Sequence, residues 1–367
     1  MWDEVPVWLV TGYAEARELL ADPRLSKDHE RALGLFPPHN DGAFVSGLNA
    51  NMLHSDPPTH TRLRKHVARA FTTRTVERLR SRITMTADRL LDDIAADGAD
   101  GAVDLIDRYA APLPIRVIGE LLGVPEHGFA AFRRDCQPLL LRATKKEKAD
   151  ASARIGALMV ELINQKRRAP ADDLLSTLVT ASPDGDRLSD DELVSTAFLL
   201  IFAGYETTVN LIGNGVLALL RNPAQQAMLR ADLTKLPEAV EEFLRFDGAV
   251  HIATLRFTTQ PIQVGDVDIP ADEFVMISLL AANRDGDRFA DPDRLDLSRK
   301  ANSHLAFGRG IHHCVGAPLA RLEGQIAFER LLKRYADITL AAAEPLEYHD
   351  SSLMHGLIAL PVRLRNP

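Results

Sequence analysis

The chain has 367 residues, of which 46% are hydrophobic and 26% are charged, as is usual for a soluble globular protein. Its 43 basic and 51 acidic side chains give a net charge of −8, which argues against general affinity for nucleic acid or anionic membranes. Two cysteines, Cys136 and Cys314, exclude a disulfide framework. There is no signal-peptide pattern, and the longest apolar run, residues 197–204, is far shorter than the roughly 20 residues that span a bilayer. We therefore expect a cytoplasmic protein without a membrane anchor.

Most of the chain has the pattern of helices separated by turns that contain proline and glycine. Apolar residues recur at helical spacing over residues 75–95, 105–122, 190–220 and 236–245. The third of these segments is long and strongly apolar, and the sequence Arg221-Asn222-Pro223 ends it. Strand patterns cover only residues 8–10, 255–258, 262–264, 274–277 and 357–364. The sequence therefore predicts a mainly α fold with small β-sheets, and it argues against a doubly wound sheet.

One cysteine lies in a constrained loop, AFGRGIHHCVGAP, that runs from Ala306 to Pro318. Gly308 and Gly310 allow tight turns, and the final proline suits the first turn of a following helix. Cys314 therefore precedes a helix N-terminus, where free N–H groups favour a thiolate. Such a thiolate can be a nucleophile or a soft metal ligand, and a buried structural thiol is a third interpretation. The residues alone leave these three interpretations open.

The same loop resembles the haem-binding loop of bacterial cytochromes P-450, whose pattern is Phe-Gly-x-Gly-x-His-x-Cys-x-Gly. Every fixed position is met, at Phe307, Gly308, Gly310, His312, Cys314 and Gly316. The resemblance implies that this loop binds haem b and that Cys314 is the thiolate ligand of the iron. It also implies the cytochrome P-450 fold, a triangular prism of helices with the haem between the long helix and the helix that follows the cysteine.

The long helix contains a second motif, Ala203-Gly204-Tyr205-Glu206-Thr207. The simplest explanation would be a threonine bonded to the preceding turn and a glutamate on a solvated face. The preceding residues are apolar on all sides, however, which predicts a buried helix. The family has Ala-Gly-x-Asp/Glu-Thr at this place, over the distal face of the haem. By resemblance, Glu206 and Thr207 are the catalytic pair that passes protons to the oxygen being reduced.

A third motif, Glu242-Phe243-Leu244-Arg245, lies between the long helix and the cysteine loop. A glutamate and an arginine three residues apart on a helix often form no more than a weak pair. In the family, a Glu-x-x-Arg at this place pairs with a later basic residue, which corresponds to Arg294. The resemblance implies that these three charged residues hold the core around the haem and take no part in the chemistry.

Haem carries two propionates that need cationic partners, and Arg and His suit them. The segment from His54 to Arg64 resembles the beginning of the family's third helix, where a His and an Arg four residues later reach the propionates. This implies propionate contacts from His60 and Arg64. Arg256 corresponds to a strand arginine with the same role, and His312 completes the set. Each of the four residues could by itself be a surface cation. It is less plausible that all four are surface cations, because each stands at a position that matches the family.

The family's variable substrate-contact segments correspond here to mostly apolar residues. The candidates are Leu199, Ala203, Val250, Ile252, Ala253 and Met354. His251 and His355 lie among them and could serve as polar anchors or point away. The loop over residues 31–51 is rich in Gly, Pro and Asn, and we expect it to act as a mobile lid.

Together, the motifs predict one haem-binding monooxygenase domain over residues 1–367, with a shorter N-terminal segment than is usual for the family. We expect a monomer that activates O2 and hydroxylates a small, largely apolar natural product. Because no flavin or iron–sulfur motif is present, electrons are expected from a ferredoxin and a ferredoxin reductase. The expected docking face for an acidic ferredoxin consists of Arg62, Lys65, Arg69, Arg74, Arg309 and Arg321.

Two alternative functions use the same motifs. A family member that forms C–C or C–O bonds by oxidative coupling would have the same residues, so only product analysis separates it. A haem sensor or carrier without turnover has no need of a proton relay. The pair Glu206 and Thr207 therefore argues against the sensor or carrier.

Overall fold

The computed structural model of the chain describes residues 5–36, 48–96, 101–180, 186–300, 303–342 and 345–366. Most of the expected lid over residues 31–51 lies outside these described residues. The helices are α1 (Tyr13–Leu19), α2 (His29–Leu33), α3 (Thr59–Ala68), α4 (Thr73–Glu77), α5 (Arg80–Ala96), α6 (Pro112–Leu122), α7 (Phe129–Leu140), α8 (Lys145–Arg168), α9 (Leu174–Val179), α10 (Asp190–Arg221), α11 (Pro223–Ala231), α12 (Leu236–Phe246), α13 (Leu279–Ala282) and α14 (Ala317–Arg334).

The strands are short and form small sheets. They are β1 (Trp8–Val10), β2 (Leu25–Ser26), β3 (Val103–Asp104), β4 (Arg256–Thr258), β5 (Ile262–Val264), β6 (Val267–Ile269), β7 (Phe274–Ile277), β8 (Asp337–Leu340) and β9 (Pro361–Arg365). One sheet has the order β1-β7-β4-β2, a second the order β3-β9-β8, and β5 pairs with β6. The predicted mainly α fold with small sheets is confirmed.

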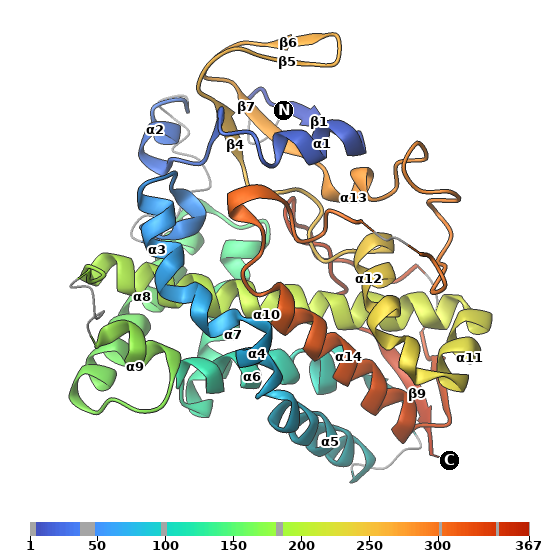
Figure 1. Cartoon of the computed structure of the whole chain (residues 1–367). Helices are drawn as coiled ribbons and strands as arrows, with labels where there is room; N and C mark the ends of the chain where they lie inside the picture. Colours follow the sequence, from blue (N-terminus) through green and yellow to red (C-terminus); the bar gives the residue numbers. More distant parts are fainter. Residues whose placement is uncertain are drawn as a thin grey trace.

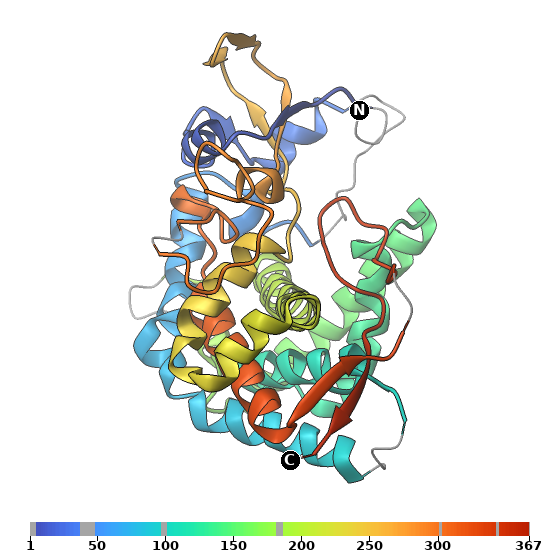
Figure 2. The ribbon, with the colours of Figure 1, turned by 90° about the vertical axis from the view of Figure 1, so that its right-hand side faces the viewer.

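The long helix α10 forms the centre of the helical body. Its first turn is fixed by a capping box, in which Ser189 and Glu192 each bond to the main chain of the other. Figure 1 shows α10 crossing the molecule with α14 beside it, and Figure 2 views it nearly end-on with other helices around it. Among the described residues, it is the one helix long and apolar enough to cross a membrane, but 72% of that apolar window is buried inside the fold, as in a core helix.

Three predicted elements differ in detail from the structure. The helix expected over residues 75–95 is divided into α4 and α5. The helix expected over residues 105–122 begins with a π-helical turn, Ile106–Ala110, and α6 starts only at Pro112, which lacks a main-chain N–H. The last strand, expected over residues 357–364, is observed as β9 and begins later, at Pro361.

The glutamate and arginine of α12 are completely buried and form the centre of a polar cluster. Glu242 is 1% exposed, and its carboxylate accepts hydrogen bonds from Arg245 Nε at 2.7 Å and Nη2 at 2.8 Å. The Arg245 guanidinium also donates to the carbonyl oxygens of Asn283, Pro292 and Arg294. The cluster therefore fastens α12 to the irregular segment that precedes the cysteine loop.

The basic side chain that the structure places on Glu242 from that segment is Arg299. Its Nε lies 3.2 Å from Glu242 Oε1. Arg294, which the sequence suggested for this ion pair, joins the cluster through its main-chain carbonyl, 3.2 Å from Arg245 Nη2. Sequence reasoning missed Arg299 because the segment has no regular spacing from which contacts can be deduced.

Replacing Glu242 tests this cluster. We expect Glu242→Ala to lower the free energy of unfolding by about 3–5 kcal/mol, because it leaves the buried Arg245 charge without its carboxylate. Glu238→Ala, on the exposed side of the same helix, is the matched control and should change it by less than about 0.5 kcal/mol. Urea unfolding measures both, and equal effects would contradict a structural role for the cluster.

Candidate active site

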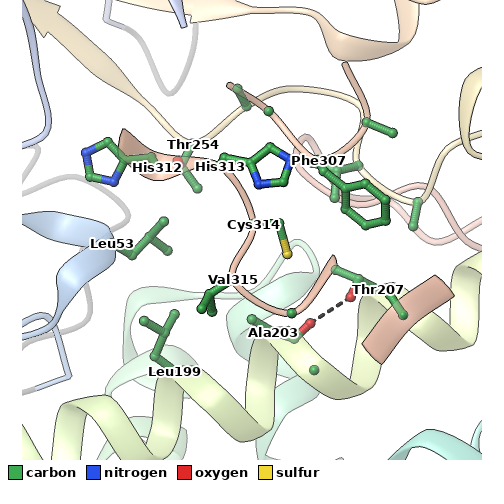
Figure 3. A pocket seen from close by; sticks show the side chains of 18 of the residues that line it. Leu53, Leu199, Ala203, Thr207, Thr254, Phe307, His312, His313, Cys314 and Val315 are labelled. Atoms are coloured by element: carbon green, nitrogen blue, oxygen red, sulfur yellow. Dashed lines mark hydrogen bonds between the residues drawn. The ribbon is translucent and has the colours of Figure 1, made fainter. Parts of the chain in front are cut away.

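The cysteine loop is shaped by two glycines with left-handed backbone. Gly308 has φ +67° and Gly310 has φ +73°, values that side chains other than glycine rarely allow. A Cβ on Gly310 would lie 2.8 Å from the Cα of Ala21, so this position also needs glycine for space. The turn returns the chain so that the Cys314 N–H donates to the Phe307 carbonyl at 2.9 Å. Figure 3 shows the Cys314 sulfur pointing from the loop toward α10.

The thiol of Cys314 is accessible from a cavity, and the protein atoms around it influence its pKa in opposite directions. Burial raises the pKa of the Cys314 thiol above its ordinary value. The main-chain N–H groups of Gly316 and Ala317 and the guanidinium groups of Arg64 and Arg321 act in the opposite direction, but they do not overcome burial. A bound metal cation would supply the missing positive charge and deprotonate the thiol.

A cavity with a volume of about 280 Å³ separates the cysteine loop from α10. Cys314 and Phe307 line the wall formed by the loop, while Ala203, Glu206 and Thr207 line the wall formed by α10. The structure therefore brings the two main predicted motifs together at one cavity, although 98 residues, 208–305, lie between them in the sequence.

The two polar residues on the α10 wall are suited to handling protons. Burial raises the pKa of Glu206 to about 7, and the nearby Arg133 opposes this rise only in part. The Thr207 hydroxyl donates to the Ala203 carbonyl at 2.6 Å, which leaves its oxygen able to accept a further hydrogen bond. A carboxyl group with a pKa near 7 can both take up and release a proton at neutral pH. Sequence reasoning missed Arg133, since it reaches Glu206 from a different helix, α7.

Positive charge gathers at another part of the cavity wall. Arg64, Arg256 and His312 line the cavity, as predicted, and the buried ring of His60 lies 4.5 Å from that of His312, between ring centroids. Burial lowers the pKa of both histidines, and it lowers the pKa of Arg256 to about 10. His312 Nε2 is buried and has no hydrogen-bond partner among the described residues. Lys27, which the sequence did not suggest, lines the same cavity.

These residues fit a flat group that carries two carboxylates and a metal. Among the residues that the structure describes, the carboxylates that line the cavity belong to Glu206 on α10 and Glu323 on α14, and burial raises the pKa of each. Within the described part of the chain, the cavity wall thus has basic side chains without a neighbouring wall carboxylate, and a bound dianion would offset the charge of Arg64, Arg256 and Lys27. Haem provides both the carboxylates and an iron for Cys314.

Five of the six predicted substrate-contact residues line this cavity. They are Leu199, Ala203, Val250, Ala253 and Met354. Ile252 is not among the lining residues, and its main chain pairs with that of Ser278. His251 and His355 also lie outside the lining: their ring centroids are 4.3 Å apart, and His355 Nε2 lies 2.9 Å from Asp247. They do not act as polar anchors in this cavity.

Two members of the basic face expected to dock ferredoxin are engaged in ion pairs within the protein. Arg62 forms ion pairs with Glu192 and Asp186, and Arg321 forms a two-point ion pair with Glu241. The other members, Lys65, Arg69, Arg74 and Arg309, are exposed. The charge available to a partner is therefore smaller than the sequence suggested.

Comparison with known proteins identifies the family. The family model described as Cytochrome P-450 matches residues 115–355. PikC, a cytochrome P-450 monooxygenase of Streptomyces venezuelae, is 48% identical over 98% of this chain and 85% of its own length. The 6-deoxyerythronolide B hydroxylase of Saccharopolyspora erythraea is 42% identical over 97% of this chain and 89% of its own length.

A solved structure supports the same family assignment. The structure of the tirandamycin C-bound P-450 monooxygenase TamI superposes on this chain with a TM-score of 0.92 at 48% sequence identity, covering 98% of this chain and 90% of the TamI chain. The expected fold and the expected haem cofactor are thereby confirmed. The chain belongs to the cytochrome P-450 family, and it is a haem-dependent monooxygenase.

Proposed function

We propose that this monooxygenase hydroxylates a small, largely apolar natural product of the polyketide class. The observation that carries the proposal is the apolar wall opposite Cys314, formed by Leu199, Ala203, Val250, Ala253 and Met354 around one cavity. Similarity to PikC, to 6-deoxyerythronolide B hydroxylase and to a monooxygenase solved with tirandamycin C bound supports this substrate class. An apolar cavity with few polar groups binds such molecules by burying their surface.

In the proposed arrangement, Cys314 binds the haem iron, and Phe307, Gly308 and Gly316 form the loop that lies against the haem. Haem, when bound, supplies the activation of O2 and the transfer of one oxygen atom to the substrate. His60, Arg64, Arg256 and His312 hold the propionates by charge and hydrogen bonds. The apolar residues of the wall hold the substrate and exclude water from it.

Glu206 and Thr207 would deliver the protons that the reduction of oxygen consumes. Thr207 is placed to hold a water molecule in the cavity, because its hydroxyl hydrogen is already donated to Ala203. Glu206 can supply that water with a proton, since its pKa is raised to about 7.

Electrons would come from a ferredoxin and its reductase, and an acidic ferredoxin would dock on Lys65, Arg69, Arg74 and Arg309. All four side chains are exposed, and attraction between opposite charges accelerates such encounters. The rate of haem reduction should then fall as ionic strength rises, and a rate that is independent of salt would count against this face.

The ligand role of Cys314 can be tested by optical spectroscopy. In the reduced, carbon monoxide-bound protein we expect the red-shifted Soret band of a haem thiolate, and we expect Cys314→Ala to abolish it. Cys136→Ala is the matched control, because this second cysteine is buried in α7, and it should keep the band. A band at the blue position of histidine-ligated haem in the unmodified protein would overturn the assignment.

The proton-delivery role predicts loss of product with continued oxygen consumption. We expect Thr207→Ala to lower the rate of product formation by about tenfold or more and to release hydrogen peroxide instead. Thr208→Ala is the matched control, since Thr208 is the next residue and its hydroxyl lies 3.3 Å from the Gly204 carbonyl. Product and peroxide are measured together, and equal behaviour of the two variants would argue against Thr207.

The substrate class can be tested by titration of the ferric protein. We expect macrolactone polyketides to displace water from the iron and shift the haem spin state, with dissociation constants in a range of about 1–100 μM. Long-chain fatty acids and steroids are the comparison compounds. If these bind and polyketides do not, the proposed class is wrong. Product analysis of a bound compound then separates hydroxylation from oxidative coupling.

A further inference from the structure

A buried lysine lies beside the predicted propionate contacts and has no assigned role. Lys27 follows β2, which pairs with β4 so that Leu25 lies opposite Thr258 and Ser26 opposite Phe257. Continuing this antiparallel register by one residue places Lys27 opposite Arg256. Like charges directly opposite each other destabilise a sheet, and burial increases the cost. The fold therefore brings two cations together where either would be costly without an anion.

The Lys27 ammonium group is buried, and within the described part of the chain it donates one hydrogen bond. The residue is 4% exposed, and its Nζ donates to Thr254 Oγ1 at 2.5 Å. Arg256 is 5% exposed, and its Nη1 donates to the Thr254 carbonyl at 2.7 Å. Thr254 thus holds both cationic groups, one through its hydroxyl and one through its main chain. A hydroxyl and a carbonyl are neutral, so neither offsets the two charges.

The same carboxylate, Asp56, is the one that favours a positive charge on both Lys27 and Arg256. It is already bonded to the Ser26 hydroxyl at 2.5 Å and to the Lys27 main-chain N–H at 3.1 Å. One carboxylate that is engaged in this way cannot neutralise two buried cations. The pKa of Lys27 is accordingly lowered well below its ordinary value, by burial and by Arg256.

Lys27 also lies among the other residues expected to hold the propionates. It lines the cavity together with Arg64, Arg256 and His312. The His60 ring lies 4.5 Å from the ring of His312, between ring centroids, and belongs to the same group of basic side chains. An anion bound among the four predicted contacts would therefore lie near Lys27 as well.

We propose that Lys27 is a fifth propionate-binding residue, whose ammonium group pairs with a haem propionate beside Arg256. The inference rests on the placement of haem in this cavity. In the absence of an anion, Lys27 can remain as a neutral amine on Thr254. With a propionate beside it, the protonated form gains a charge-assisted hydrogen bond.

The test compares holoprotein variants by haem retention. Lys27→Met keeps the length of the side chain and removes its charge, and Lys27→Arg keeps the charge. Lys148→Met on α8 is the matched control far from the cavity in sequence. The carbon monoxide spectrum first establishes haem-thiolate ligation in each protein. If the unmodified protein fails at this stage, the placement of haem is wrong, which is a different failure from that of Lys27.

The rate of haem release from the ferric protein to an excess of a haem-scavenging globin is then measured. We expect Lys27→Met to release haem at least about tenfold faster than the unmodified protein, since it loses a charged hydrogen bond. Lys27→Arg should stay within about threefold, and Lys148→Met should be unchanged. The propionate bending bands in the resonance Raman spectrum should shift in Lys27→Met and stay in place in Lys148→Met.

Two results would overturn the proposal. One is a Lys27→Met protein that releases haem at the rate of the unmodified protein, with unshifted propionate bands. The other is unchanged haem release with weaker binding of an anionic substrate, which would assign Lys27 to the substrate. If Lys27→Met does not accumulate as holoprotein, Lys27→Gln, which is also uncharged, is measured with the same expectations.

Discussion

The site depends on buried positive charge that the protein itself does not neutralise at the cavity wall. Arg64, Arg256 and Lys27 line a cavity where, within the described part of the chain, the lining carboxylates are those of Glu206 on α10 and Glu323 on α14. Keeping the buried Lys27 and Arg256 side chains charged is costly, and a bound anion offsets that cost. The protein thereby prepares a position for one kind of ligand, with carboxylates at one end and a metal facing Cys314 at the centre. Binding of haem is the event that makes this region of the fold favourable.

The two sides of the cavity are prepared in different ways. The loop side is set by the main chain, through Gly308, Gly310 and the bond from the Cys314 N–H to the Phe307 carbonyl. The α10 side is set by a long helix whose residues before Ala203 are buried among apolar neighbours. The Glu242 and Arg245 cluster fastens the segment between them. A rigid loop faces a rigid helix, as a reaction that must position oxygen and substrate requires.

Motifs that are local in sequence could be predicted, while contacts between distant segments could not. The bounds of α10 followed from its apolar pattern, and the cysteine loop followed from its glycines. Arg299, Arg133 and Lys27 were missed because each reaches its partner from another element through tertiary packing. The division between α4 and α5 and the π-helical turn before Pro112 were missed because both segments keep helical periodicity. The sequence also could not show which residues of the segment 250–253 face the cavity: Val250 and Ala253 line it, but Ile252 does not.

The hydrogen bond from Arg64 Nη2 to the His313 carbonyl, 2.7 Å long, joins α3 to the cysteine loop one residue before the thiol. The same guanidinium lines the cavity where a propionate would lie. Arg64 therefore links three things: the conformation of α3, the position of Cys314 in its loop, and the presence of a ligand in the cavity. Loss of the cofactor would loosen α3 and the loop together, so protection of their main-chain amides from hydrogen exchange should be gained and lost as one cooperative unit.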